Sequence, residues 1–81
     1  MLHARSDYDR IQDPDGLIPE DEPVFLIRGC DRTGAATLRH WAALNQALPD
    51  HDDHAIQLAL GQADKMDAWH TKKTSDVPPE A

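Results

Sequence analysis

Apolar residues recur at helical spacing in the middle of the chain, beginning near Gly34. The stripe contains Leu38, Trp41, Ala42, Leu44 and Leu48. Spacings of three and four residues are typical of an amphipathic helix that packs along one side. Thr33 or Asp31 can cap the first turn, and Pro49 stops the helix. The pattern therefore predicts a helix over residues 34–48.

A second apolar stripe follows a short linker that is rich in aspartate. It contains Ile56, Ala59, Leu60, Ala63, Met66 and His70, with Trp69 beside it. The aspartates suit the positive N-terminal end of a helix, and Lys72 and Lys73 suit its negative C-terminal end. Gly61 either permits close helix contact or marks a weak point of the helix, and we favour close contact. The pattern predicts a helix over 51–73 that runs antiparallel to the first.

The N-terminal part of the chain lacks helical periodicity. Val24 to Ile27 are four consecutive apolar residues between Pro23 and Gly29, which favours a short buried strand over 24–28. Residues 1–23 are interpreted as extended chain and loop.

The sequence also predicts a turn in the N-terminal segment and disorder at the end of the chain. The residues from Asp13 to Gly16 form a turn signature. The segment 8–12 can pair with the strand as a hairpin, or the apolar segment can pack on the helices without a sheet, and both arrangements stay open. Residues 74–81 are predicted to be a disordered tail.

Together these elements indicate an α+β fold that is mostly α, with an N-terminal extended segment packed on a helical hairpin. Residues 1–73 suffice for a single small domain. Large apolar side chains are few, and a core this thin is often completed by oligomerisation, so we expect a homo-oligomer. The lone cysteine, Cys30, excludes an intrachain disulfide, and no apolar run is long enough to span a membrane, so we expect a cytoplasmic protein without a membrane partner.

The net charge of the chain disfavours one class of partner, long nucleic acids. The formal net charge is −7, with 15 acidic and 8 basic residues, and this sign repels the backbone of a long nucleic acid. The segment 28–40 departs from this trend, because it holds three arginines against Asp31 alone. A local basic patch is therefore expected inside an acidic protein.

The junction between the predicted strand and the first helix is the candidate binding site. The first amides of a helix favour an anion, and the fork-shaped donors of Arg28 and Arg32 suit phosphate or carboxylate. Thr33, Arg39 and the ring of Trp41 are the candidate assisting groups. The spacing of neither a P-loop nor a dinucleotide-binding fold is present. The alternative is that Arg28 and Arg32 pair with carboxylates of the chain itself, among Glu20, Asp21, Glu22 and Asp31.

Other chemistry has weaker support. Cys30 near two arginines suggests a nucleophile, but the surrounding sequence identifies no general base for it. His51 and His54 have metal-ligand spacing, but the positive end of a helix opposes a cation. We therefore expect no enzyme, no catalytic residues, no metal site and no cofactor.

The stretch IPEDEPVFLIRGCD, followed by LRHWA and ADKMDAW, resembles a group of short, uncharacterised proteins of bacteriophages and prophages. The likeness covers residues 18–69, and the run from Pro19 to Phe25 is its most specific part. The group often has glutamine at the position of Cys30. The resemblance brings no catalytic assignment. It implies a phage-type accessory protein that acts by binding, either to a host protein or to a nucleotide signal of bacterial defence.

These observations lead to two functional hypotheses. The first is non-catalytic binding of a small phosphorylated ligand, such as a nucleotide second messenger that is thereby sequestered in the host cytoplasm as an anti-defence measure. The second is an acidic protein-interaction module, an inhibitor or adaptor, whose carboxylates between Asp13 and Glu22 bind a host protein.

Overall fold

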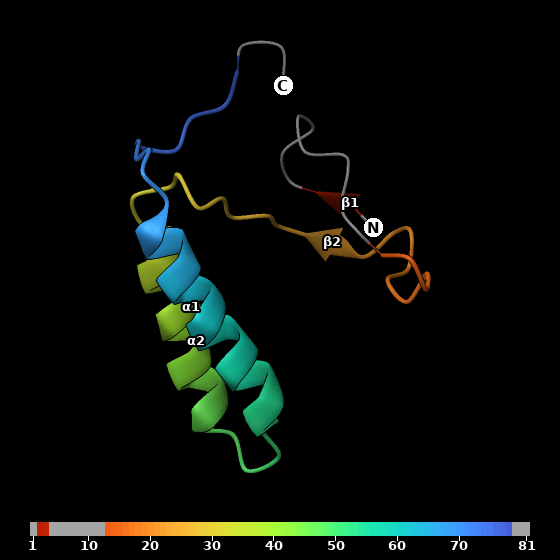
Figure 1. The fold of residues 1–81 in the computed structure, drawn as a ribbon. Coiled ribbons are helices and arrows are strands. Elements are labelled where there is room, and N and C mark those ends of the chain that lie inside the picture. The colour runs from red at the N-terminus through yellow and green to blue at the C-terminus, as the bar shows by residue number, and fades with distance from the viewer. Residues whose placement is uncertain (1, 4–12, 79–81) are drawn as a thin grey trace. The chain divides into compact units, whose positions relative to one another are not determined.

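The computed structural model describes residues 2–3 and 13–78 (Figure 1). In chain order the elements are β1 (Leu2–His3), β2 (Pro23–Val24), α1 (Gly34–Gln46) and α2 (Asp53–Ala68). The fold is α+β and mostly α, which confirms the predicted class. Contacts within the chain group it into two compact units, where the sequence predicts one domain. The first unit is Met1–Leu26 with Asp76–Ala81, and the second is Ile27–Ser75.

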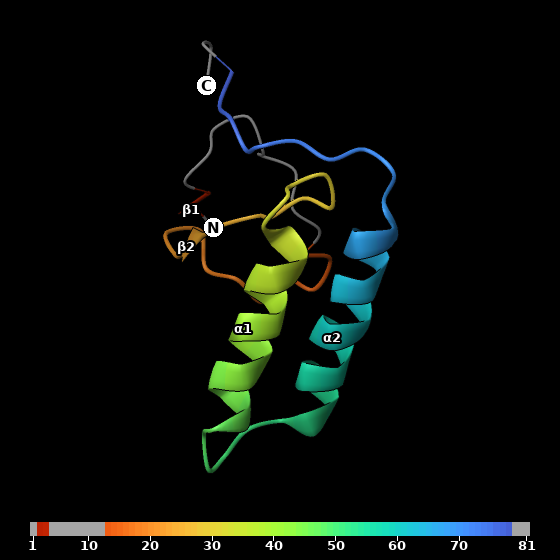
Figure 2. The same ribbon diagram turned by 90° about the vertical axis from the view of Figure 1, so that its left-hand side faces the viewer.

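The second unit is built on the hairpin of α1 and α2, which run side by side and antiparallel (Figures 1 and 2). Its core is made of the small residues Ala35 and Ala63 together with Met66, and Ile27 and Leu38 pack against it. Small side chains let the helices approach closely, but they bury little apolar area each. The hairpin therefore has a thin core.

Both helices are shorter than the sequence predicts. α1 ends at Gln46 rather than at residue 48, and the Leu48 amide bonds to the Asn45 carbonyl at 3.0 Å, closing the last turn. α2 ends at Ala68 rather than at residue 73, because Trp69 takes an extended conformation with φ −65° and ψ 127°. The predicted helical turn that carries Lys72 and Lys73 is therefore wrong, since both lysines follow the helix in non-helical chain.

The start of α2 follows the expected capping chemistry. Asp52 is the N-cap residue, and its carboxylate accepts a hydrogen bond from the Ala55 amide at 3.1 Å. Asp53 adds an acidic side chain in the first turn. The interpretation of Gly61 as a close contact is wrong, because a Cβ placed there would meet nothing within 4 Å.

The strand predicted over 24–28 is largely absent. β2 covers only Pro23–Val24, which pairs in parallel with β1 in the register Leu2 with Pro23 and His3 with Val24. Phe25 is 65% exposed, so the apolar run is not a buried strand. The alternative hairpin with residues 8–12 lies outside the described residues.

The turn predicted from Asp13 to Gly16 is confirmed. The Gly16 amide donates to the Asp13 carbonyl at 3.0 Å, and Gly16 has a φ of +62°, which glycine adopts without strain. The Asp13 carboxylate accepts the amides of Leu17 and Ile18 at 3.0 and 3.1 Å.

The start of the predicted tail takes part in the fold. Ser75 donates its hydroxyl to the Asp31 carboxylate at 2.6 Å. Residues 79–81 lie outside the described residues. In the described part of the chain, neither helix combines the length and apolar character that crossing a bilayer requires.

Candidate functional site

Residues 28–33 lead into α1 through two turns. The Asp31 amide donates to the Arg28 carbonyl at 3.1 Å, and the Gly34 amide donates to the Asp31 carbonyl at 3.0 Å. A Cβ on Gly34 would lie 2.7 Å from Met66 Cε and 2.9 Å from the carbonyl oxygen of Arg28. Only glycine fits there without displacement, so the loop lies close against α2.

The chain after α2 returns to this loop. The Lys73 amide donates to the Cys30 carbonyl at 2.8 Å, and the Lys73 carbonyl accepts the Arg32 amide at 3.0 Å. These two bonds form a short parallel bridge outside the sheet. The loop is thus held at a second point that is distant in sequence.

The side chain of Lys72 completes this attachment. Its ammonium donates to the Gly29 carbonyl at 2.8 Å and also to the Met66 carbonyl near the end of α2. The Met66 carbonyl also accepts the Trp69 amide at 3.1 Å, and a cation at the C-terminal end of a helix suits its negative dipole end. Lys72 therefore links the loop directly to the C-terminal end of α2.

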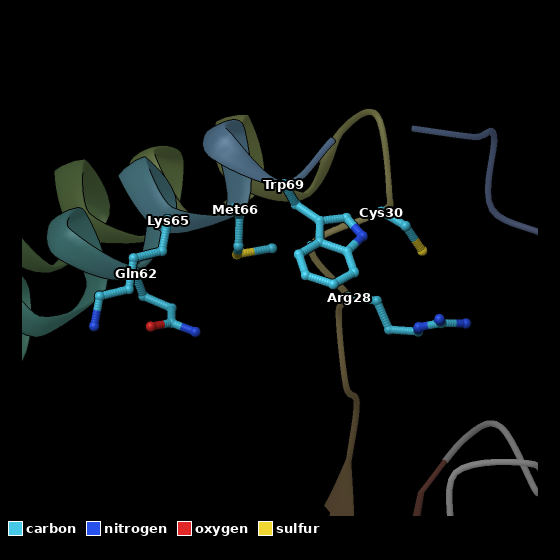
Figure 3. Close-up of a pocket in the computed structure, with 7 residues that line it drawn as sticks. Arg28, Cys30, Gln62, Lys65, Met66 and Trp69 are labelled. Carbon is cyan, nitrogen blue, oxygen red and sulfur yellow. The ribbon is translucent and has the colours of Figure 1, made fainter. Parts of the chain in front are cut away.

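A pocket of about 380 Å³ lies between this loop and the C-terminal half of α2 (Figure 3). It is lined by Arg28, Gly29, Cys30, Gln62, Lys65, Met66 and Trp69. Figure 3 shows the side chains of Gln62 and Lys65 extending to the same side as the indole of Trp69. Arg28 lies at the rim beyond the indole, with its guanidinium directed away from Lys65 and Gln62.

The chemical character of this pocket is cationic and aromatic. Its seven lining residues include one guanidinium and one ammonium and no carboxylate. The Trp69 side chain is 53% exposed, so a planar group can reach its ring. His70 supports the indole from the side, with ring centroids 4.8 Å apart at an angle of 43°. The arrangement can bind an anion that carries a flat ring.

A carboxylate of the chain itself lies at the entrance to α1, where the sequence predicts an anion site. Asp31 Oδ1 accepts the amide and the hydroxyl of Thr33, both at 2.8 Å. Thr33 is the N-cap residue of α1, yet its side chain makes no capping bond to the helix. The polar groups of Thr33 that were expected to hold a ligand are therefore bonded to Asp31.

Arg39 is engaged between the two helices. Its Nη2 lies 3.0 Å from Asp64 Oδ1 and 2.6 Å from Asp67 Oδ2, both on α2. The hydrogen bond to Asp67, followed by that to Asp64, raises the pKa of Arg39 above its usual value. Arg39, which was expected to assist a ligand, is therefore paired with carboxylates of the same chain, and the sequence singled out neither of these acids.

Of the five predicted ligand residues, the structure places Arg28 alone at the pocket. Arg32, Thr33 and Arg39 are exposed and do not line it, and Trp41 is 45% exposed on α1. Sequence reasoning did not assign to this site Gln62 and Lys65 of α2 or Trp69, which follows the helix directly. Their spacing of three and four residues places them together beside the apolar stripe, and this was the signal in the sequence. The spacing indicates a pocket only once the loop around residue 30 is known to lie against the end of α2.

His51 of the histidine pair is hydrogen-bonded within the chain, and Cys30 is buried. His51 Nδ1 lies 2.7 Å from the Leu48 carbonyl, and its Nε2 lies 3.0 Å from Asp53 Oδ1. No group of three or more potential ligands is arranged for a metal ion within residues 2–3 and 13–78. Cys30 is 7% exposed and contributes to the apolar part of the pocket.

Comparisons with models of protein families, with curated proteins and with solved structures found no match for this chain. Its site is therefore interpreted from its own residues.

Proposed function

We propose that this chain is a non-catalytic binding protein that takes a small phosphorylated ligand with an aromatic base, such as a nucleotide, in the pocket between the loop and α2. The observation that carries the proposal is the pocket lining. It combines Arg28, Lys65 and the exposed indole of Trp69 without a carboxylate, in a chain of net charge −7. A concave cationic site in an acidic chain is suited to a small anion rather than to a long polyanion.

Each side chain has a distinct part in this binding. The indole of Trp69 offers a stacking surface for a base, and such stacking tolerates any base because all have a flat face. Lys65 supplies a point charge for phosphate. Arg28, exposed at the rim, carries the fork-shaped donors that suit a bidentate contact with phosphate. Gln62 can donate and accept toward the edge of the base or the sugar.

The side chains that line the pocket suit binding of a ligand without its chemical conversion. The pocket lining holds one thiol, Cys30, but neither an imidazole nor a carboxylate to act as its base. The residues present would bind a phosphate group and leave its bonds intact. A protein of this kind acts by lowering the concentration of its ligand, which in the host cytoplasm would silence a nucleotide second messenger of defence.

Isothermal titration calorimetry against a panel of mono-, di- and cyclic nucleotides tests the proposal. The wild type should give saturable heat with at least one of them. Arg28→Ala and Lys65→Ala should each weaken binding by about 10- to 100-fold, the range for losing a charged hydrogen bond. Circular dichroism checks that each variant keeps its helices.

Arg32→Ala is the matched control. It removes the same charge from the same loop, but Arg32 does not line the pocket, so its affinity should stay near that of the wild type. Absence of heat with every nucleotide would contradict the proposal. An equal loss of affinity in the Arg28 and Arg32 variants would indicate that the ligand binds at the start of α1 instead.

A second candidate function is an acidic protein-interaction module. Glu20, Asp21 and Glu22 are consecutive, exposed carboxylates in the first unit. A basic partner surface would complement them. Replacing all three by the corresponding amides should abolish capture of such a partner and leave nucleotide titrations unchanged, so the two candidates give separate readouts.

A further inference from the structure

The pocket has two walls that come from different parts of the chain. The loop supplies Gly29, and the end of α2 supplies Met66, which Trp69 follows. The walls lie close together, because a Cβ built on Gly29 would be 3.6 Å from Trp69 Cβ and 3.7 Å from Met66 Cα. Glycine adds no side chain to this contact. Polar bonds are therefore left to fix how the two walls lie against each other.

Lys72 is bonded to both walls at once. Its ammonium donates to the Gly29 carbonyl at 2.8 Å and to the Met66 carbonyl. The Met66 carbonyl also accepts the Trp69 amide, at the point where the chain leaves α2 and becomes extended. One ammonium thus joins the loop to the turn that presents the indole. Lys72 itself is not among the residues that line the pocket.

The segment that carries Lys72 is also attached to the loop by its backbone. The Lys73 amide donates to the Cys30 carbonyl at 2.8 Å, and the Lys73 carbonyl accepts the Arg32 amide at 3.0 Å. Both bonds join this segment to the loop. The ammonium of Lys72 continues from the loop to a carbonyl of α2, so it connects all three parts of the site.

We infer that Lys72 is a positioning residue for nucleotide binding. It holds the Gly29 wall against the end of α2, so that Lys65 and the indole of Trp69 keep one geometry toward the loop. A site whose walls are ordered before binding loses less binding free energy to ordering them. If the walls were in place only about a tenth of the time, the apparent affinity would fall about tenfold. The inference rests on the proposed function, and it places a determinant of affinity outside the pocket.

Amide hydrogen exchange without nucleotide tests whether Lys72 holds the loop. The Arg32 amide is the reporter, because its acceptor is the Lys73 carbonyl and Arg32 itself is distant in sequence from residue 72. In Lys72→Met this amide should exchange at least about tenfold faster than in the wild type. Lys72→Arg keeps a positively charged donor and should restore slow exchange. Residue 72 follows α2, so circular dichroism should show the same helices in every variant.

Calorimetry with the nucleotide panel described above tests the effect on binding. Lys72→Met should weaken the affinity at least about tenfold, and Lys72→Arg should recover most of it. Lys73→Met is the matched control. It removes the same charge from the next residue and retains the backbone bonds of Lys73 to the loop, so it should bind like the wild type.

Two results would overturn this inference and leave the proposed function intact. The first is wild-type affinity or unchanged Arg32 exchange in Lys72→Met. The second is an equal loss of affinity in Lys72→Met and Lys73→Met, which would show that the positive charge matters and the two carbonyl bonds do not. A wild type that gives no heat with any nucleotide would instead contradict the proposed function, and this inference with it.

Discussion

At the scale of single residues, carboxylates of the chain decide what its cations can do. Arg39 bonds to Asp64 and Asp67, so it contributes to the hairpin and not to the pocket. Lys65 follows Asp64 directly, yet it extends toward the pocket. Adjacent positions on a helix point about 100° apart, which is enough to give neighbouring charges separate roles.

His51 makes the stability of the hairpin depend on pH. Its ring nitrogens face the Leu48 carbonyl and the Asp53 carboxylate, two acceptors that only the doubly protonated ring can satisfy together. The bond to the Leu48 carbonyl, and then the interaction with Asp53, raises the pKa of His51 above 6.5. A pKa raised by folding stabilises the protein below the unfolded value of about 6.5, and this contribution is lost as pH rises through the folded value.

We therefore expect the free energy of unfolding in urea to be higher near about pH 5.5 than near about pH 8.5, the interval in which histidine titrates. His51→Gln should reduce this difference. His54→Gln, which removes an exposed histidine from the first turns of α2, should retain it. An unchanged pH dependence in the His51 variant would show that the two bonds of its ring do not contribute.

At the scale of elements, the sequence predicts the helices better than their ends. The helical spacing correctly identifies Ala42, Ile56 and Ala63 as buried, because packing on one side imposes that spacing. Trp41, Leu44 and Leu48 belong to the same predicted stripe and are exposed. The end of α2 depends instead on Trp69 and on the distant carbonyl of Gly29, which accepts Lys72. A local pattern contains no information about that carbonyl. The same holds for the pocket, which forms only where the loop meets α2.

Replacing two glycines of the helices by alanine should change the stability of the fold in opposite directions. Gly34→Ala should destabilise the fold by about 1 to 3 kcal/mol, the usual cost of overpacking, because the new methyl group meets the backbone oxygen of Arg28. Gly61→Ala should stabilise it by about 0.5 to 1 kcal/mol, because the site is open and alanine favours a helix. Chemical denaturation measures both. A loss of stability in the Gly61 variant would contradict the open environment of that position.

At the scale of the whole molecule, the charge of the pocket is opposite in sign to the net charge of the chain. The chain is acidic as a whole, yet the pocket is lined by Arg28 and Lys65 and by no carboxylate. Composition alone predicts that long nucleic acids are repelled. It does not predict where the remaining positive charge lies, because Arg28 and Lys65 come from segments that only folding brings together.

The central claim is that a nucleotide binds at Trp69, and the amide and indole spectrum of the nitrogen-15-labelled protein tests it most directly. The chain has two tryptophans, so the indole signals provide an internal comparison. On titration with a nucleotide that gives heat, the indole signal of Trp69 and the side-chain amide of Gln62 should shift together and saturate. The indole of Trp41, outside the pocket, should stay in place. Shifts at Trp41 or at Thr33 with an unchanged Trp69 would contradict the claim, as would a spectrum that no nucleotide alters.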